Sequence, residues 1–102
     1  MPRSKKYKDL LIEQLKDPKE ALLYFNAILD ECRDCDEEEA KQLVLQALKN
    51  ITEAQGGMAE LAEKTKLGRQ SLYKTLSPKG NPKLSTLITI TNVLLATPAR
   101  KR

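Results

Sequence analysis

The sequence predicts an all-α protein, and three observations support this class. The chain has one Phe, three Tyr and no Trp among its 102 residues, so a core must be built from Leu, Ile, Val and Ala. Apolar residues recur along several segments at the i, i+3, i+4 spacing of a helix face. The four Gly and five Pro residues stand at the apparent ends of these segments. A chain of this length is expected to form one domain.

Two helices are expected within residues 1–35. The first covers positions 7–15, with apolar residues at 7, 10, 11 and 15. The second begins at Pro18, where Asp17 suits the N-cap and Glu20 a capping box. It runs to about Cys32, and its apolar side consists of Ala21, Leu22, Phe25, Ile28, Leu29 and Cys32. We interpret the pair as a helical hairpin packed on the core, serving either core packing or contact with another protein.

A third helix is expected over residues 37–54, where six apolar residues follow one helix face. Asp36 and Glu39 have the spacing of a capping box at its start. The face consists of Ala40, Leu43, Val44, Ala47, Leu48 and Ile51. The acidic stretch 30–39 is either a solvated, well-capped helix start or a site for a basic partner.

Residues 56–82 have the pattern of a helix-turn-helix, whose second helix enters the major groove of DNA. Two short helical segments are separated by a tight polar turn. Their apolar positions, including the corner between them, are Met58, Leu61, Ala62, Leu67, Leu72 and Leu76.

The polar stripe of the second segment has the chemistry that base edges require. Residues 69 and 73, and 70 and 74, are i, i+4 pairs on one side of the helix. Arg can bind O6 and N7 of guanine, and Gln can bind N6 and N7 of adenine. We therefore expect Arg69, Gln70, Tyr73 and Lys74 to read bases, with a phosphate contact as the alternative for Lys74. The competing interpretation is the solvated face of an ordinary surface helix.

Residues 77–83 are expected to form a loop, because Pro78, Gly80 and Pro82 interrupt any helix there. A last helix should run from Leu84 to about Leu95, which completes a DNA-binding region over 36–97. Residues 98–102 then form a basic tail. The apolar side of the last helix consists of Leu84, Leu87, Ile88, Thr91, Leu94 and Leu95.

Two parts of the chain resemble a known family. The run GGMAELAEKTKLGRQSLYKTLSPKGNPKLSTL is similar to the helix-turn-helix of phage Cro and repressor proteins, and most similar to bacterial addiction-module antidote proteins. The segment LKDPKEALLYFNAIL is also similar to that family. Lys66 departs from the pattern, because Gly is usual in the turn and a left-handed Lys costs about 1–2 kcal/mol. Gly68 stands where Ser or Thr usually caps the second helix, at a cost of only a few tenths of a kcal/mol.

The resemblance implies a five-helix Cro/repressor-like domain with an N-terminal helical hairpin extension. It also implies an antitoxin that binds operator DNA as a homodimer, represses its own operon and neutralises a cognate toxin. In Cro-type domains the loop after the second helix lies along the DNA backbone. Gly57 is expected at the start of a helix, where backbone amides can approach a phosphate. The residues expected to contact phosphates are Gly57, Ser71, Ser77, Lys79, Asn81 and Lys83. The alternatives are a stand-alone transcriptional regulator and a protein-interaction module built on the same scaffold.

Charge is distributed unevenly along the chain. Basic and acidic residues number six and four over residues 1–29, three and eight over 30–55, and nine and two over 56–102, which gives net charges of +2, −5 and +7. The positive charge lies with the helix-turn-helix, as expected for a partner that carries phosphates. The basic residues among 1–8 are either an additional phosphate-binding arm or a solubilising tail.

The sequence argues against an enzyme and against a membrane protein. It has no His, and it contains neither a P-loop nor a GxSxG nucleophile turn. No apolar run reaches the length of a membrane span, and the N-terminus lacks the apolar core of a signal peptide. We therefore expect a cytoplasmic protein without cofactor or metal.

Cys32 and Cys35, the two cysteines of the chain, form a CxxC pair. A structural zinc site needs four ligands, so a metal would need two chains or the help of Asp34, Asp36 or Glu37. A redox function needs positive surroundings that stabilise a thiolate, whereas the neighbours here are mostly acidic. We interpret the pair as two reduced thiols at a helix end.

Overall fold

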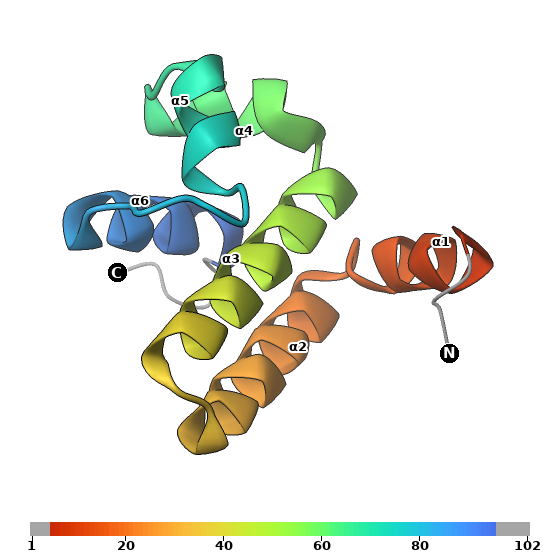
Figure 1. Cartoon of the computed structure of the whole chain (residues 1–102). Helices are drawn as coiled ribbons and strands as arrows, with labels where there is room; N and C mark the ends of the chain where they lie inside the picture. The colour runs from red at the N-terminus through yellow and green to blue at the C-terminus, as the bar shows by residue number, and fades with distance from the viewer. Residues whose placement is uncertain (1–4, 96–102) are drawn as a thin grey trace, which may run out of the picture.

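The computed structural model describes residues 5–95, which form six α-helices and one 3-10 turn and contain no strand (Figure 1). This confirms the all-α class. The six α-helices correspond to the segments expected from the sequence, including the two separated at Asp17-Pro18. The five-helix Cro/repressor-like domain implied by the resemblance stays a prediction. The elements are α1 (Lys5–Gln14), α2 (Pro18–Glu31), η1 (Cys32–Asp34), α3 (Glu37–Ala54), α4 (Gly57–Thr65), α5 (Arg69–Thr75) and α6 (Leu84–Leu95). The expected tail at 98–102 lies outside the described residues.

The central helix is α3, which contacts α1, α2, α4 and α6. Figure 1 shows α2 lying along it, with α4 and α5 beyond its C-terminal end. Its predicted apolar face supplies the buried residues Ala47, Leu48 and Ile51, and Leu45, which was not predicted, is buried as well. The molecule is therefore organised around one long amphipathic helix.

The caps of α2 and α3 hold the starts of these helices. At α3 the predicted capping box is confirmed: the backbone N–H of Glu39 donates to Asp36 Oδ1 (2.8 Å), and the backbone N–H of Asp36 donates to Glu39 Oε1 (3.4 Å). Asp17 caps α2 as predicted. The capping box predicted at Glu20 is wrong, because the backbone N–H of Asp17 donates to the carbonyl of Gln14 (3.3 Å), while Glu20 Oε1 accepts from Gln14 Nε2 (2.9 Å).

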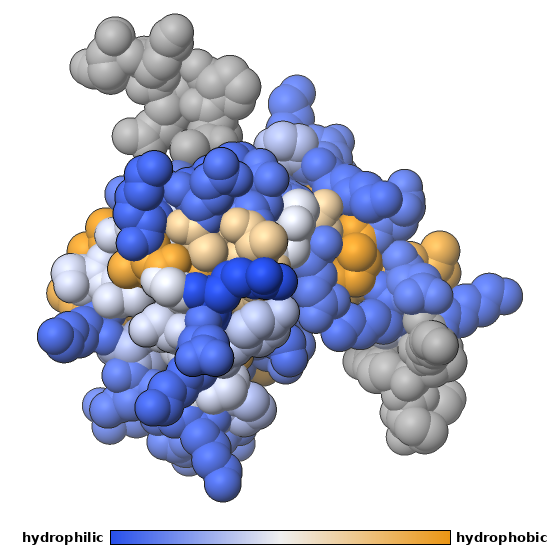
Figure 2. All heavy atoms as spheres, turned by 90° about the horizontal axis from the view of Figure 1, so that it is seen from above, coloured by the Kyte–Doolittle hydropathy of each residue, from blue (hydrophilic) through white to orange (hydrophobic). Residues whose placement is uncertain are grey.

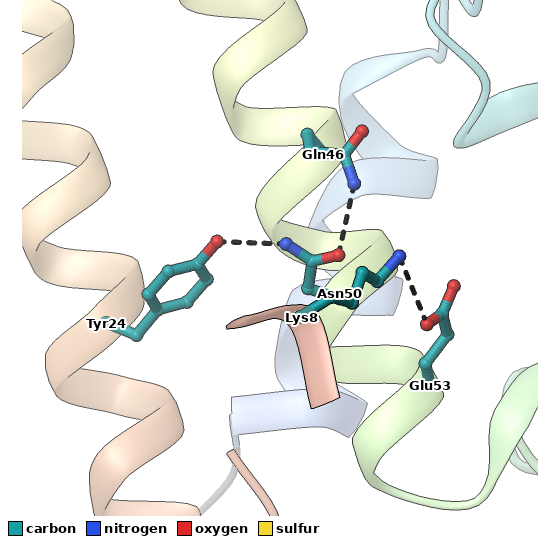
Figure 3. A network of polar contacts seen from close by, with 5 residues as sticks. All are labelled: Lys8, Tyr24, Gln46, Asn50 and Glu53. Carbon is teal, nitrogen blue, oxygen red and sulfur yellow. Dashed lines mark hydrogen bonds and ion pairs between the residues drawn. The ribbon is translucent and has the colours of Figure 1, made fainter. Parts of the chain in front are cut away.

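Polar contacts fix the two N-terminal helices on α3 (Figure 3). The buried Asn50 donates from Nδ2 to the Tyr24 hydroxyl (3.1 Å) and accepts at Oδ1 from Gln46 Nε2 (3.1 Å). Lys8 of α1 pairs with Glu53 of α3 at 3.6 Å. Because a buried amide without a partner is costly, the Tyr24 contact ties α2 to one position along α3.

α1 begins at Lys5, two residues before its predicted start, and its predicted apolar face is partly wrong. Leu10 is 65% exposed and Tyr7 is exposed as well. The other two predicted residues are confirmed: Leu11 packs against the core, and Leu15, directly after the helix, is fully buried. Figure 1 shows α1 projecting to one side of the molecule, so only its inner side is covered.

The predicted apolar face of α6 is also partly wrong. Leu84 is 72% exposed and Ile88 is 50% exposed, whereas Ile90, which was not predicted, is fully buried. The helix is turned so that Leu87 and Leu94 lie on the core side with Ile90. Its sequence contains Ser, Thr and Asn but no charged residue, so the spacing of its apolar residues selects a face less clearly.

Candidate nucleic-acid interface

α4 and α5 are joined by a three-residue turn, which hydrogen bonds of the Thr65 hydroxyl stabilise. Lys66 ends α4 in the left-handed conformation (φ 65°), and Gly68 precedes α5 in an extended one. The Thr65 hydroxyl donates to the carbonyl of Leu61 (2.8 Å) and accepts from the backbone N–H of Leu67 (3.3 Å). The turn that was expected at this place is therefore tight.

The inner sides of α4 and α5 are anchored in the core. Leu61 and Leu76 are each 2% exposed, Leu72 is fully buried, and Met58 is buried with them. These apolar positions were predicted from spacing and are confirmed. Because the leucines on one side of α5 are buried in the core, the opposite side of the helix faces solvent.

The outer side of α5 carries the residues predicted to read bases. Arg69, Gln70, Tyr73 and Lys74 are all exposed, Tyr73 to 54%. Ser71 is exposed too, on a different side of the helix from Arg69. Figure 2 looks onto the end of the molecule that carries α4 and α5, and hydrophilic side chains cover most of it. α5 contains no acidic residue.

Apart from Lys64, the basic residues of this half have no acidic partner among the described residues. Within residues 5–95, ion pairs engage several basic residues elsewhere, Lys8, Lys16, Arg33 and Lys41 among them, and also Lys64 in α4. The basic residues of α5, the turn and the loop make no ion pair with any described residue; they are Lys66, Arg69, Lys74, Lys79 and Lys83. Uncompensated positive charge of this kind attracts phosphates.

The loop after α5 presents the predicted phosphate contacts Lys79, Asn81 and Lys83 at the surface. Ser77 is half-buried, and its hydroxyl donates to the carbonyl of Lys74 at 2.8 Å, so a phosphate would compete with that bond. Gly57, with φ 85°, is half-buried at the first residue of α4.

Gly80 has a structural role in this region that the spacing of residues in the sequence did not predict. It is buried, and its backbone N–H donates to the carbonyl of Ser77 (2.9 Å). A Cβ here would come within 2.9 Å of the Lys74 carbonyl oxygen and even closer to Thr75. The loop therefore lies against the end of α5 through a position that only glycine can occupy. The only signal in the sequence was its place between two prolines.

Replacing Lys66 with Gly should raise the free energy of unfolding by about 1 kcal/mol, because glycine adopts φ 65° without the steric cost of a Cβ. Urea denaturation measures this change. Lys64→Gly, inside α4, is the matched control and should lower the same quantity by about 1 kcal/mol. An equal loss in both variants would contradict the strain assigned to Lys66.

The two cysteines are separate, half-exposed thiols. Cys32 Sγ donates to the carbonyl of Ala40 (3.7 Å), and Cys35 Sγ donates to that of Glu31 (3.6 Å). Desolvation, followed by the negative charge of Glu39, raises the pKa of the Cys35 thiol. Both observations fit the interpretation as reduced thiols.

Cys35 should react with iodoacetamide more slowly than a cysteine in an unstructured peptide at pH 8, because its raised pKa leaves less thiolate at that pH. The rate should continue to rise at pH values where the peptide rate has levelled off. The measurement uses a Cys32→Ser variant. Adding Glu39→Gln should speed the reaction, and an unchanged rate would contradict the contribution of Glu39.

Comparison with known proteins decides the family. A family model with the description "Probable addiction module antidote protein" matches residues 6–99. The chain belongs to this antidote family. A relative from Haemophilus influenzae (strain ATCC 51907 / DSM 11121 / KW20 / Rd), described as an uncharacterized protein, is 34% identical over 82 residues, which cover 80% of this chain and 76% of the relative. No solved structure matches the chain.

The match to the family model extends beyond α4 and α5, because it begins in α1 and continues past α6. It confirms the resemblance to addiction-module antidote proteins. The role of an antidote is regulatory rather than enzymatic. None of the helices in the described part of the chain combines the length and apolar character needed to cross a bilayer.

Proposed function

We propose that this antidote protein is an antitoxin that binds operator DNA as a homodimer, represses its own operon and neutralises the toxin of the same module. The outer side of α5 carries this proposal. Four residues suited to bases and phosphates, Arg69, Gln70, Tyr73 and Lys74, stand there in a row, and the helix has no acid to repel DNA.

In this proposal each copy places α5 in a major groove, and the two helices of the homodimer lie about 34 Å apart along the duplex. Arg69 and Gln70 contact base edges, and Tyr73 packs on a thymine methyl or a sugar. Lys79, Asn81 and Lys83, with the helix start at Gly57, then hold the phosphates on either side. Phosphate contacts fix the register, and base contacts select the sequence.

Toxin binding is proposed for the acidic segment from Asp30 to Glu39, which joins α2 to α3. Figure 1 shows this segment at the far end of α3 from α4 and α5. A basic toxin bound there would leave the outer side of α5 free, so that one antitoxin can hold toxin and DNA together.

Replacing Lys79 and Lys83 with Ala should weaken DNA binding about equally for all sequences. The slope of log affinity against log salt concentration should fall by about one for each lysine and each copy of the chain. Fluorescence anisotropy at several salt concentrations measures this slope. Lys16→Ala with Lys19→Ala, on the α1–α2 side, is the matched control and should leave it unchanged. An unchanged slope in the loop variant would remove the loop from the interface.

A further inference from the structure

A hollow of about 400 Å³ lies between the first half of α3 and the end of α5. Leu76, which follows the last residue of α5, and Pro78 of the next loop form one wall. The other wall belongs to α3 and carries Leu43 and two exposed amide side chains, Gln42 and Gln46. Figure 1 shows the loop running from α5 towards α3. The volume is within the range of known ligand sites, so the hollow is large enough to receive side chains of a partner.

The part of this hollow nearest the start of α3 is acidic. Cys35 and Glu39 line it there. Among residues 5–95, Glu31, Asp36 and Glu39 form no ion pair. Besides desolvation, the negative charges of these three carboxylates raise the pKa of the Cys35 thiol. The surroundings of Cys35 therefore have a negative potential that no ion pair within the described chain reduces.

We infer that this hollow receives a segment of the toxin in which Lys or Arg stands beside an apolar side chain. The apolar side chain packs on Leu43, Leu76 and Pro78, which removes apolar area from water. The cation meets the carboxylate of Glu39, and the two glutamines of the α3 wall can hydrogen-bond to the backbone of the segment. The same carboxylate repels nucleic acid, so the hollow suits a basic protein partner.

This inference rests on the proposed neutralisation of a toxin and names the place where the toxin is held. It extends the toxin site from the acidic segment 30–39 along α3 to Pro78, one residue before Lys79. None of the residues of α5 itself, Arg69–Thr75, lines the hollow. The toxin therefore contacts the loop next to a proposed phosphate contact, while the base-reading side of α5 stays uncovered.

Alkylation of Cys35 by iodoacetamide tests the occupant. The Cys32→Ser variant of the full chain is mixed with a saturating amount of the purified product of the adjacent gene, the toxin of the proposed module. The rate at Cys35 should fall about 10-fold or more, because a segment packed in the hollow excludes the reagent. The control is Cys35→Ser, which leaves Cys32. This thiol lines a different hollow with Leu29 and Leu87, so its rate should stay unchanged.

A charge variant tests the acidic contact. Glu39→Gln should raise the dissociation constant of the toxin about 10-fold or more, measured by isothermal titration calorimetry. Gln keeps an oxygen that can accept the capping hydrogen bond from the backbone N–H of Asp36. The matched control is Glu37→Gln, in the same turn of α3. Glu37 lines the other hollow, so this variant should leave the affinity nearly unchanged. Circular dichroism checks that both variants keep their helix content.

The possible outcomes separate this inference from the proposed function. A toxin that binds wild type without slowing alkylation of Cys35 would overturn the site and leave neutralisation standing. A wild type that does not bind the toxin would overturn both. Equal losses in Glu39→Gln and Glu37→Gln would overturn the site, because they would reflect long-range attraction alone. Faster alkylation of the free chain after removal of residues 97–102 would assign the hollow to the basic tail and also overturn the inference.

Discussion

Replacing Arg69 and Gln70 together with Ala will reduce the affinity for the operator to the affinity for a scrambled duplex. Each bidentate contact with a base contributes about 1–3 kcal/mol of discrimination. A homodimer makes both contacts twice, so the variant loses four, which corresponds to a factor of about 10³ or more. Fluorescence anisotropy at one fixed salt concentration measures the ratio of the two affinities.

The matched control removes the same residue types elsewhere. Arg33→Ala with Gln42→Ala changes two exposed residues that pair within the acidic half, with Asp30 and Glu38. This variant should keep the full preference for the operator. The α5 variant should still neutralise the toxin, because that function is placed at the other end of α3. If it kept its preference for the operator, the bases would be read by another part of the chain.

Replacing Gly80 with Ala will lower the free energy of unfolding by about 1–3 kcal/mol, the usual cost of overpacking. The new Cβ would collide with the Thr75 carbonyl oxygen and lie 2.8 Å from its carbonyl carbon. These are backbone atoms at the end of α5, so they cannot move aside as a flexible side chain would. The loop must shift away from α5, and DNA affinity should fall with it. Urea denaturation and anisotropy measure the two effects.

Gly68→Ala is the control for this prediction. At Gly68 a Cβ would meet only Ser71 Cβ at 4.0 Å, and the backbone conformation is ordinary. The loss should stay at or below about 1 kcal/mol, the scale of a helix N-cap change. A Gly80→Ala variant as stable as wild type would mean that the loop does not pack on the end of α5.

The sequence predicted best the elements whose apolar residues alternate with polar ones. The spacing of α3 and the leucines of α5 placed these helices correctly, because charged neighbours mark their outer sides. The same contrast picked out Arg69, Gln70, Tyr73 and Lys74 as exposed residues. The capping box at Asp36 was predictable for a similar reason, since it depends only on residues three positions apart.

The features that the sequence did not reveal depend on contacts between distant residues or lack a polar contrast. α6 has no charged residue to mark its outer side, so its face was misplaced. Asn50 is one polar residue on an apolar face, and its partner Tyr24 is 26 positions away. Gly80 matters because it touches the backbone of α5 across the loop. No periodic pattern records such a contact.

The proposed operator binding requires that α5 reads one DNA sequence. The most direct test titrates wild-type protein onto a labelled duplex from the region upstream of its own gene and onto a scrambled duplex of the same composition. We expect binding to the upstream duplex to be about 10³-fold tighter or more. Equal, weak binding to both duplexes would contradict it and would favour a protein-interaction module.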